Sequence, residues 1–188
     1  MKKGLIVGGT IVGIVLLLIV MFSSTYNGLV SKEEEVEGKL ADISVQLERR
    51  ADLIPNLVNT VKGYASHEKE VIDSITTSRE KLLNADSAEE MAEANQELSN
   101  AINNLLVIVE NYPDLKANTN FIQLQDELAG TENRIAVARK DYNDAVKSYN
   151  KEIKLFPKNI LANMFGFESK EYFEAKESSN NVPNVSFE

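Results

Sequence analysis

The side chains that could do chemistry in this sequence are mainly arginines and carboxylates, and they gather in two stretches far apart along the chain. A guanidinium group beside carboxylates can form ion pairs, or it can bind a polar ligand through its several N–H donors. One stretch surrounds Pro55, and the other lies on a later helical pattern. The candidate residues for a partner or ligand site are Arg49, Arg50, Asp52, Asn56, Glu127, Glu132, Arg134 and Arg139.

These charged residues have two interpretations. Arg50 falls on an apolar seam of its helical pattern, where it must find a partner because an unpaired charge away from water is costly. The four charged residues of the later stretch flank a second seam, at positions that coiled coils use for ion pairs between helices. We favour the structural interpretation, in which these charges fix helix pairing. The functional interpretation, a polar pocket for a ligand or partner between Arg50 and Asn56, stays open.

No catalytic set accompanies these residues. His67 is the sole histidine, and the run His67–Val71 begins like a zinc-protease helix but has valine where the second histidine is required. The chain has no cysteine, which excludes thiolate catalysis and cysteine-based zinc or iron–sulfur sites. It also lacks a G-x-S-x-G nucleophile turn and a glycine-rich phosphate loop. We therefore expect a protein that is not an enzyme and holds no metal or cofactor.

The elements that must position these residues are helices, because apolar residues recur every seven positions along two long stretches. No segment alternates as a strand would. Several such seams with short connections predict an antiparallel four-helix-type bundle with long helices. The first stretch holds Tyr26, Glu33, Leu40, Leu47 and Ile54, with Leu29, Val36, Ile43 and Arg50; the later one holds Phe121, Leu128, Ile135, Tyr142, Tyr149 and Phe156.

Pro55 interrupts the first of these stretches. Proline lacks a backbone N–H and clashes inside a helix, at a cost of about 3 kcal/mol. We therefore predict a break or kink near residues 50–54, followed by a second helix that runs to about Asn84. Gly63 would then be a weak point inside this second helix.

Further signals mark the later helix ends. Residues 85–90 are typical of a connection that carries an N-cap and an acidic first turn. The run Tyr112–Asp114 contains a proline and ends the third helix. The fourth helix is predicted over roughly residues 118–155, and Phe156–Pro157 ends it.

The segment after Pro157 is rich in large apolar side chains, which predict a short packing helix closed by Gly166. We favour an arrangement in which these side chains cap the open end of the bundle. The alternative is a surface that docks a partner or touches the membrane. The candidate docking residues are Met164, Phe165, Phe167, Tyr172 and Phe173.

The N-terminal run Gly4–Phe22 is apolar except for Thr10, and a helix of that length spans the hydrocarbon core of a bilayer. The run ends without an A-x-A cleavage site or a cysteine for lipidation. We therefore favour a retained single-pass anchor over a cleaved signal peptide, and expect its helix to continue into the domain. Glycines spaced by four in this run would allow a homo-oligomer through the anchor, although glycine is common in membrane helices.

The charge distribution bears on partners and orientation. The chain carries a net charge of −9, and its acidic residues all lie beyond the anchor. Nucleic acid and anionic lipid head groups should repel such a domain, which argues against a nucleic-acid-binding role. Lys2 and Lys3 with the terminal amine slightly outweigh Lys32 and Lys39 across the anchor, which favours an inside N-terminus and an outside domain.

Two long motifs resemble a known family. The first is VQLERRADLIPNLV at Val45–Val58, and it continues to Glu68. The second begins with YPDLKA at Tyr112, includes TENRIAVAR at Thr131–Arg139, and continues to Phe173. Together they resemble the LemA family of bacterial membrane proteins over nearly the whole chain. One departure is Leu40, where many members of that family carry tryptophan; it is a core position, so the predicted fold is unaffected.

The resemblance implies one N-terminal membrane helix and a helical-bundle domain, without a defined molecular function. The short N-terminus of LemA-like proteins is often predicted to lie outside, which opposes the charge count and leaves the side of the domain open. Their genes often neighbour membrane-protease genes. This association makes a membrane protease a candidate partner and envelope quality control a candidate role.

These observations predict an all-α protein with a transmembrane anchor at residues 1–22, a LemA-like bundle at 23–176 and a flexible tail at 177–188. We expect a bacterial cell-membrane protein that works as a scaffold or adaptor through protein–protein contact. The alternative is a small-ligand-binding or sensor domain that signals through a membrane partner.

Overall fold

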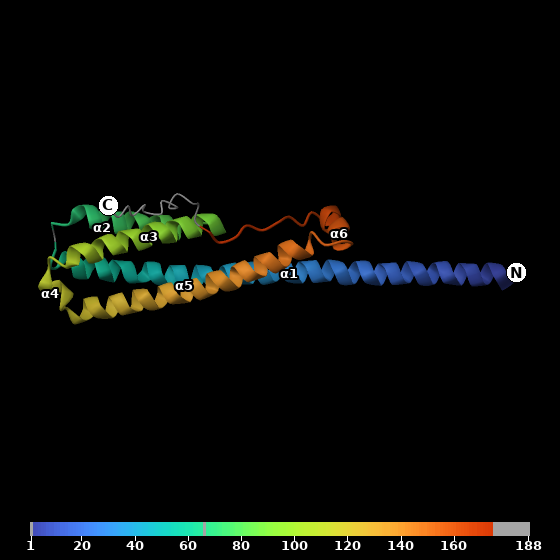
Figure 1. Cartoon of the computed structure of the whole chain (residues 1–188), viewed down its shortest axis with the longest axis horizontal. Helices are drawn as coiled ribbons and strands as arrows, with labels where there is room; N and C mark the ends of the chain where they lie inside the picture. Colours follow the sequence, from blue (N-terminus) through green and yellow to red (C-terminus); the bar gives the residue numbers. More distant parts are fainter. Residues whose placement is uncertain (1, 66, 175–188) are drawn as a thin grey trace, which may run out of the picture. The chain divides into compact units, whose positions relative to one another are not determined.

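The structure is a computed structural model that describes residues 2–65 and 67–174, so the tail predicted at 177–188 lies outside the described residues. All elements found in the described part are helices, which confirms the all-α class (Figure 1). They are α1 (Lys2–Lys62), α2 (Lys69–Leu83), α3 (Ala88–Val109), α4 (Pro113–Lys116), α5 (Thr119–Glu152) and α6 (Lys158–Phe165).

The helices form two compact units. Among the described residues, the anchor unit comprises the chain up to residue 39 together with residues 142–170, and the bundle unit comprises residues 40–141 together with the chain that follows residue 170. Helices α1 and α5 contribute to both units, because each is one unbroken helix. The apolar N-terminal stretch therefore continues as one helix into the bundle unit, as the sequence predicts.

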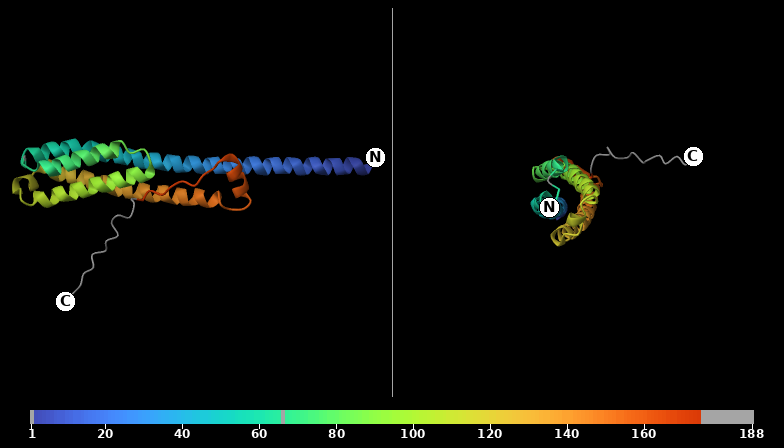
Figure 2. Two further views of the ribbon diagram at one scale, coloured as in Figure 1. Left: turned by 90° about the horizontal axis from the view of Figure 1, so that it is seen from above. Right: turned by 90° about the vertical axis from the view of Figure 1, so that its left-hand side faces the viewer.

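Four helical segments run side by side in the bundle unit, in the order α1, α2, α3 and α5, with α4 in the connection between α3 and α5 (Figures 1 and 2). Short connections reverse the chain between α1 and α2 and between α2 and α3, as in an up-and-down bundle. The seven-residue seams supply its core. Core side chains include Ile43, Leu47, Ile54, Leu57, Ile75, Leu98, Leu105, Phe121, Leu128 and Ile135.

Helix α1 runs through residues 50–54 without a break, so the prediction of a separate helix starting there is wrong. Pro55 lies inside the helix and leaves the carbonyl of Ala51, four residues earlier, without its usual backbone donor. The side chain of Arg79 on α2 replaces that donor, because its Nε donates a hydrogen bond to the Ala51 carbonyl oxygen at 2.8 Å. A contact from another helix therefore compensates for the proline.

The chain turns instead at Gly63, which the sequence pattern places inside a helix. Backbone N–H groups of Tyr64 and Ala65 both donate to the Val61 carbonyl and close the end of α1. Helix α2 then starts at Lys69 rather than near residue 52. The turn is also held from outside, because the Tyr112 hydroxyl donates to Glu68 at 2.7 Å. This bond is the main reason that the pKa of Tyr112 is raised.

The other predicted helix ends are confirmed. Ser87 caps α3 by accepting a hydrogen bond from the Glu90 N–H, and the Glu90 carboxylate reaches back to the Ser87 N–H. Pro113 occupies the first turn of α4, where its missing N–H costs nothing. Gly166 closes α6 in the left-handed conformation, with φ of 76°, that glycine adopts without strain.

The anchor unit contains the apolar stretch of α1. Among the described residues, α1 is the single helix that is long and apolar enough to cross a membrane. Its large apolar side chains from Ile11 to Phe22 are exposed rather than packed against protein. Exposed apolar side chains along a helix of this length are typical of a membrane-spanning segment.

The segment after α6 is tied to α1 and α5 at Lys170. The Asn150 side chain donates to the Lys170 carbonyl at 2.8 Å and accepts from the Lys170 N–H at 2.9 Å. The Lys170 ammonium group lies 2.7 Å from Glu33 and 3.5 Å from Glu37, and its hydrogen bond to Glu33 raises its pKa. The neighbouring Tyr149 is buried, and this burial, followed by the charge of Glu33, raises the pKa of its phenol.

The contact between Arg79 and Ala51 predicts a linked pair of substitutions. Arg79→Met keeps most of the apolar stem but leaves the Ala51 carbonyl unpaired, which should cost about 1–3 kcal/mol. At roughly 2–4 °C per kcal/mol for a chain of this size, the melting temperature of the full chain in detergent should fall measurably by circular dichroism. Pro55→Ala restores a backbone N–H to Ala51, so Arg79→Met should cost much less in that background. Equal losses in both backgrounds would contradict the compensation.

Candidate functional site

Arg50 is the charged residue that lies in the core of the bundle unit, with 4% of its surface exposed. It occupies a seam position of α1, so its stem points toward the neighbouring helices. Its Nη1 donates to Oδ1 of Asn95 on α3 at 2.5 Å and also to the Glu132 carboxylate on α5. Three helices therefore meet at one polar group.

The electrostatic balance at Arg50 has two opposed parts. Burial lowers the pKa of the guanidinium, while the negative charge of Glu132 acts in the opposite direction. The Glu132 side chain is 47% exposed, so water screens one side of the pair. Arginine keeps its proton in proteins, and the charge is therefore carried into the core. The Nε of Arg50 is buried without a hydrogen-bond partner in the structure.

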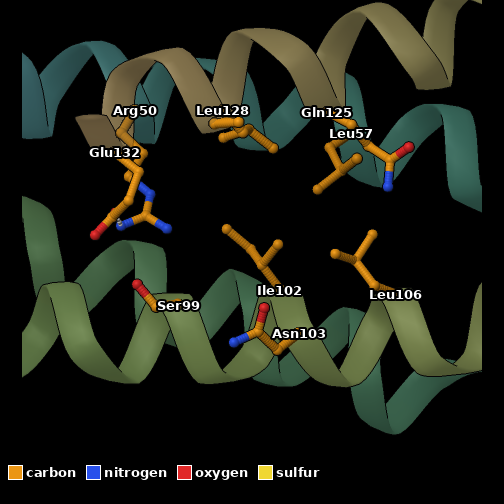
Figure 3. A pocket seen from close by; sticks show the side chains of 10 residues that line it. Arg50, Leu57, Ser99, Ile102, Asn103, Leu106, Gln125, Leu128 and Glu132 are labelled. Carbon is orange, nitrogen blue, oxygen red and sulfur yellow. Dashed lines mark hydrogen bonds and ion pairs between the residues drawn. The ribbon is translucent and has the colours of Figure 1, made fainter. Parts of the chain in front are cut away.

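A cleft of about 330 Å³ opens beside this pair, between α1, α3 and α5. Figure 3 shows Arg50 and Glu132 toward one end of the cleft, with Leu57, Leu106 and Gln125 toward the other. Most of its wall is apolar, and a few amides and hydroxyls lie among the aliphatic side chains. The lining residues are Arg50, Leu57, Ser99, Ile102, Asn103, Leu106, Gln125, Leu128, Ala129 and Glu132.

The other predicted site residues lie outside this cleft. Arg49 and Glu127 form an exposed ion pair at 3.6 Å, and both line a shallow surface hollow together with Arg134. Asn56 is exposed and lines a second hollow that Glu127 also borders.

Asp52 and Arg139 are exposed on α1 and α5, and neither lines the cleft. Arg49 pairs with Glu127, and Arg50 pairs with Glu132. Both ion pairs join α1 to α5 in the bundle unit, and all four residues are predicted site residues. The structure therefore brings two of the eight candidates, Arg50 and Glu132, to one cleft.

The candidate docking residues belong to different units and differ in exposure. Met164 and Phe165 are exposed and Phe167 is half-buried, all in the anchor unit. Tyr172 and Phe173 belong to the bundle unit, where Tyr172 is exposed and Phe173 is buried. Phe173 is thus a core residue and offers no docking surface.

Asn95 is the main residue that sequence reasoning missed. It lies four residues after Met91 and three before Leu98, so it occupies the apolar stripe of α3 just as Arg50 occupies that of α1. Two polar residues on facing stripes are therefore a readable signal. The cleft itself is not readable, because its wall comes from three helices whose relative positions the sequence does not state.

The walls of the Arg50 cleft have the composition of a binding surface. Among residues 2–65 and 67–174, no group of three or more histidines, cysteines or carboxylates is placed to hold a metal ion. His67 is exposed in the turn before α2 and lines none of the hollows described above. The cleft offers an apolar surface with hydrogen-bonding groups at its edge, which is the usual composition of a ligand or side-chain pocket.

The buried pair predicts an asymmetry between two neighbouring ion pairs. Glu132→Leu leaves the Arg50 charge without its carboxylate and should cost about 1–3 kcal/mol, less than a fully buried pair because Glu132 is half exposed. Glu127→Leu, the matched change at the exposed Arg49 pair, should cost no more than about 1 kcal/mol. Adding Arg50→Met to Glu132→Leu should recover part of the loss. Thermal unfolding that shows equal effects of the two glutamate changes would contradict this assignment.

Comparison with known proteins gives a family. The LemA family matches residues 39–187. Magnetosome protein MamQ 2 of Paramagnetospirillum magneticum is 28% identical over 177 residues, covering 80% of this chain and 65% of that protein. Magnetosome protein MamQ of Magnetospirillum gryphiswaldense is 25% identical with the same coverage. The chain thus spans just under two thirds of the length of these relatives.

A further relative has a similar identity. Protein LemA of Metamycoplasma hominis is 28% identical over 155 residues, which cover 80% of this chain and 69% of that protein. The family match extends over both motifs around Pro55 and Thr131 and includes every residue of the Arg50 cleft. The chain therefore belongs to the LemA family and, with the apolar stretch of α1, is a membrane-associated member of it.

Proposed function

We propose that this chain is a single-pass, membrane-anchored scaffold or adaptor of the bacterial cell membrane, and that it acts by protein–protein contact rather than as an enzyme. The pairing of the buried charge in the bundle supports this proposal. Arg50 is paired with Asn95 and Glu132 of the same chain, so its charge supports the bundle instead of a reaction.

The observation that carries this proposal is an apolar groove on the bundle unit. Val45 on α1 is 59% exposed and Val137 on α5 is 61% exposed, and both line one groove of about 470 Å³ with Ala138. Three charged side chains, those of Asp42, Arg134 and Asp141, line the same groove. Removing exposed valine side chains from water lowers the free energy. Two exposed valines in one groove therefore favour a surface that a partner covers.

The shape and composition of the groove indicate the kind of partner. A mixture of exposed apolar side chains with polar and charged ones is the usual composition of a protein interface. A groove between two side-by-side helices accepts a third amphipathic helix, whose apolar residues at every third or fourth position would meet the valines. We therefore propose an amphipathic helix of another membrane-associated protein as the occupant. The family resemblance favours a membrane protease as that partner, and a second copy joined through the anchor glycines is the other partner class.

Site-specific crosslinking tests the groove. A photoreactive amino acid at position 137 of the full chain should crosslink one defined species in intact membranes. Val45→Lys places a charge in the groove and should reduce that product about tenfold, the effect of losing a contact worth some 1.4 kcal/mol. The matched control carries the photoreactive group at Val107, an exposed apolar position on α3 outside the groove. A product that survives Val45→Lys, or that also forms from position 107, would count against the adaptor.

A second candidate function is recognition of a small ligand in the Arg50 cleft, as a sensor domain that signals through a membrane partner. The buried and unpartnered Nε of Arg50 favours it, because such a donor has lost its water without gaining a protein acceptor. The cleft walls suit a ligand with an apolar body and a hydrogen-bond acceptor at one end.

A thermal-shift screen separates this candidate from the adaptor. A true ligand at one hundred times its Kd should stabilise the chain by about 2.7 kcal/mol, which is several degrees in melting temperature. Ala129→Trp fills the cleft from an exposed wall position and should abolish that shift. A screen in which no compound stabilises the wild-type chain more than the Ala129→Trp variant would dismiss the ligand function.

A further inference from the structure

Helix α6 shows apolar side chains on two faces. Leu161 and Ala162 are buried in the anchor unit, as expected of a packing helix. Ile160, Met164 and Phe165 are each more than half exposed, and Phe156 just before the helix is 81% exposed. A surface helix normally turns polar residues outward, and a contiguous apolar patch is uncommon on a soluble domain. The outer face of α6 therefore lacks its partner in the isolated chain.

The position of α6 along α1 points to what covers this face. The rings of Phe165 and Phe167 pack edge-on against Tyr26, with centroids 4.9 Å and 5.8 Å away. Tyr26 lies four residues beyond Phe22, the last residue of the apolar run, which is about 6 Å along a helix. Figure 1 shows α6 beside α1 within the anchor unit. Helix α6 is therefore level with the place where α1 leaves the hydrocarbon core, where tyrosine is itself enriched.

The charge of this segment differs from that of the whole chain. The protein carries −9, yet residues 151–166 contain three lysines and one glutamate. Lys158 pairs with Glu152, while Lys151 and Lys154 are exposed on the last turn of α5 and just after it. Lysines next to exposed aromatic and aliphatic side chains are the composition of segments that lie at a lipid surface. Two exposed lysines therefore precede the apolar helix α6 in the chain, although the protein as a whole is acidic.

We propose that the outer face of α6, formed by Ile160 and Met164 with Phe156 just before the helix, inserts into the head-group region of the leaflet next to Tyr26, with Lys151 and Lys154 against lipid phosphates. The inference rests on the proposed anchor, because α1 must be in the membrane for α6 to reach it. It gives the protein a second membrane contact besides its spanning helix. A lipid surface fits better than a protein partner, since the patch adjoins the end of the membrane span.

The test uses the absence of tryptophan from the chain. Met164→Trp in the full-length protein, reconstituted in vesicles of phosphatidylcholine and phosphatidylglycerol, places a single fluorophore on the exposed face of α6. Lipids brominated near the head group should quench it about twofold, because interfacial side chains lie some 5–10 Å below the surface. Lys151→Gln with Lys154→Gln should weaken this quenching in the anionic vesicles and leave it unchanged in pure phosphatidylcholine.

Two further single-tryptophan variants separate the possible failures. Ile14→Trp reports on the anchor and should be quenched by lipids brominated deep in the acyl chains. Val107→Trp on α3 is an exposed apolar position without the lysines or the Tyr26 contact, and it should not be quenched. Quenching at position 14 but not at 164 would overturn the α6 proposal and leave the anchor intact. A loss of quenching at both positions would overturn both, and a blue-shifted but unquenched tryptophan at position 164 would assign the face to protein instead of lipid.

Discussion

A positive charge in the middle of an apolar core constrains every helix around it. Burying a guanidinium costs several kcal/mol unless its N–H groups find acceptors and its charge is paired. The Nη1 of Arg50 donates to an amide on α3 and to a carboxylate on α5, while its Nε has no protein acceptor. Helix α1 therefore holds α3 and α5 at fixed heights along its own axis, which apolar seams alone do not define. The same pair forms one end of the Arg50 cleft, so the constraint on packing also shapes the candidate site.

Much of this architecture can be predicted from local patterns. Seven-residue repeats place Leu128 and Ile135 in the core because each helix buries one stripe whatever its neighbours are. The cap at Ser87 and the stop at Gly166 depend on residues within one turn of the helix end. Pro55 misleads for the opposite reason. Whether a proline ends a helix depends on what becomes of the freed carbonyl, and here the replacement donor lies 28 positions further along the chain.

The candidate site also has parts that local sequence patterns predict and parts that depend on contacts between helices. Arg50 could be found because a charge on a seam stands out, and Asn95 could have been found by the same rule applied to α3. The cleft and the Val45–Val137 groove could not, since each is a space between side chains of different helices. Phe173 is predicted from the sequence as a candidate for a docking surface, but it is buried. The sequence does not distinguish the two cases, because a large apolar residue near a chain end has the same pattern whether it is exposed or buried. The family match and the apolar stretch of α1 together add membrane association.

The hydrogen bond from Arg79 also bears on the order in which the protein is made. Synthesis delivers Ala51 and Pro55 before Arg79, so the Ala51 carbonyl lacks this side-chain donor until the later residue has been made. The last turns of α1 become secure when α2 has emerged and folded back along them. This pairing is local in sequence, and local contacts form early because little chain entropy is lost in closing a short loop. Helices α1 and α2 are therefore expected to mature together as a hairpin, ahead of the long return of α5.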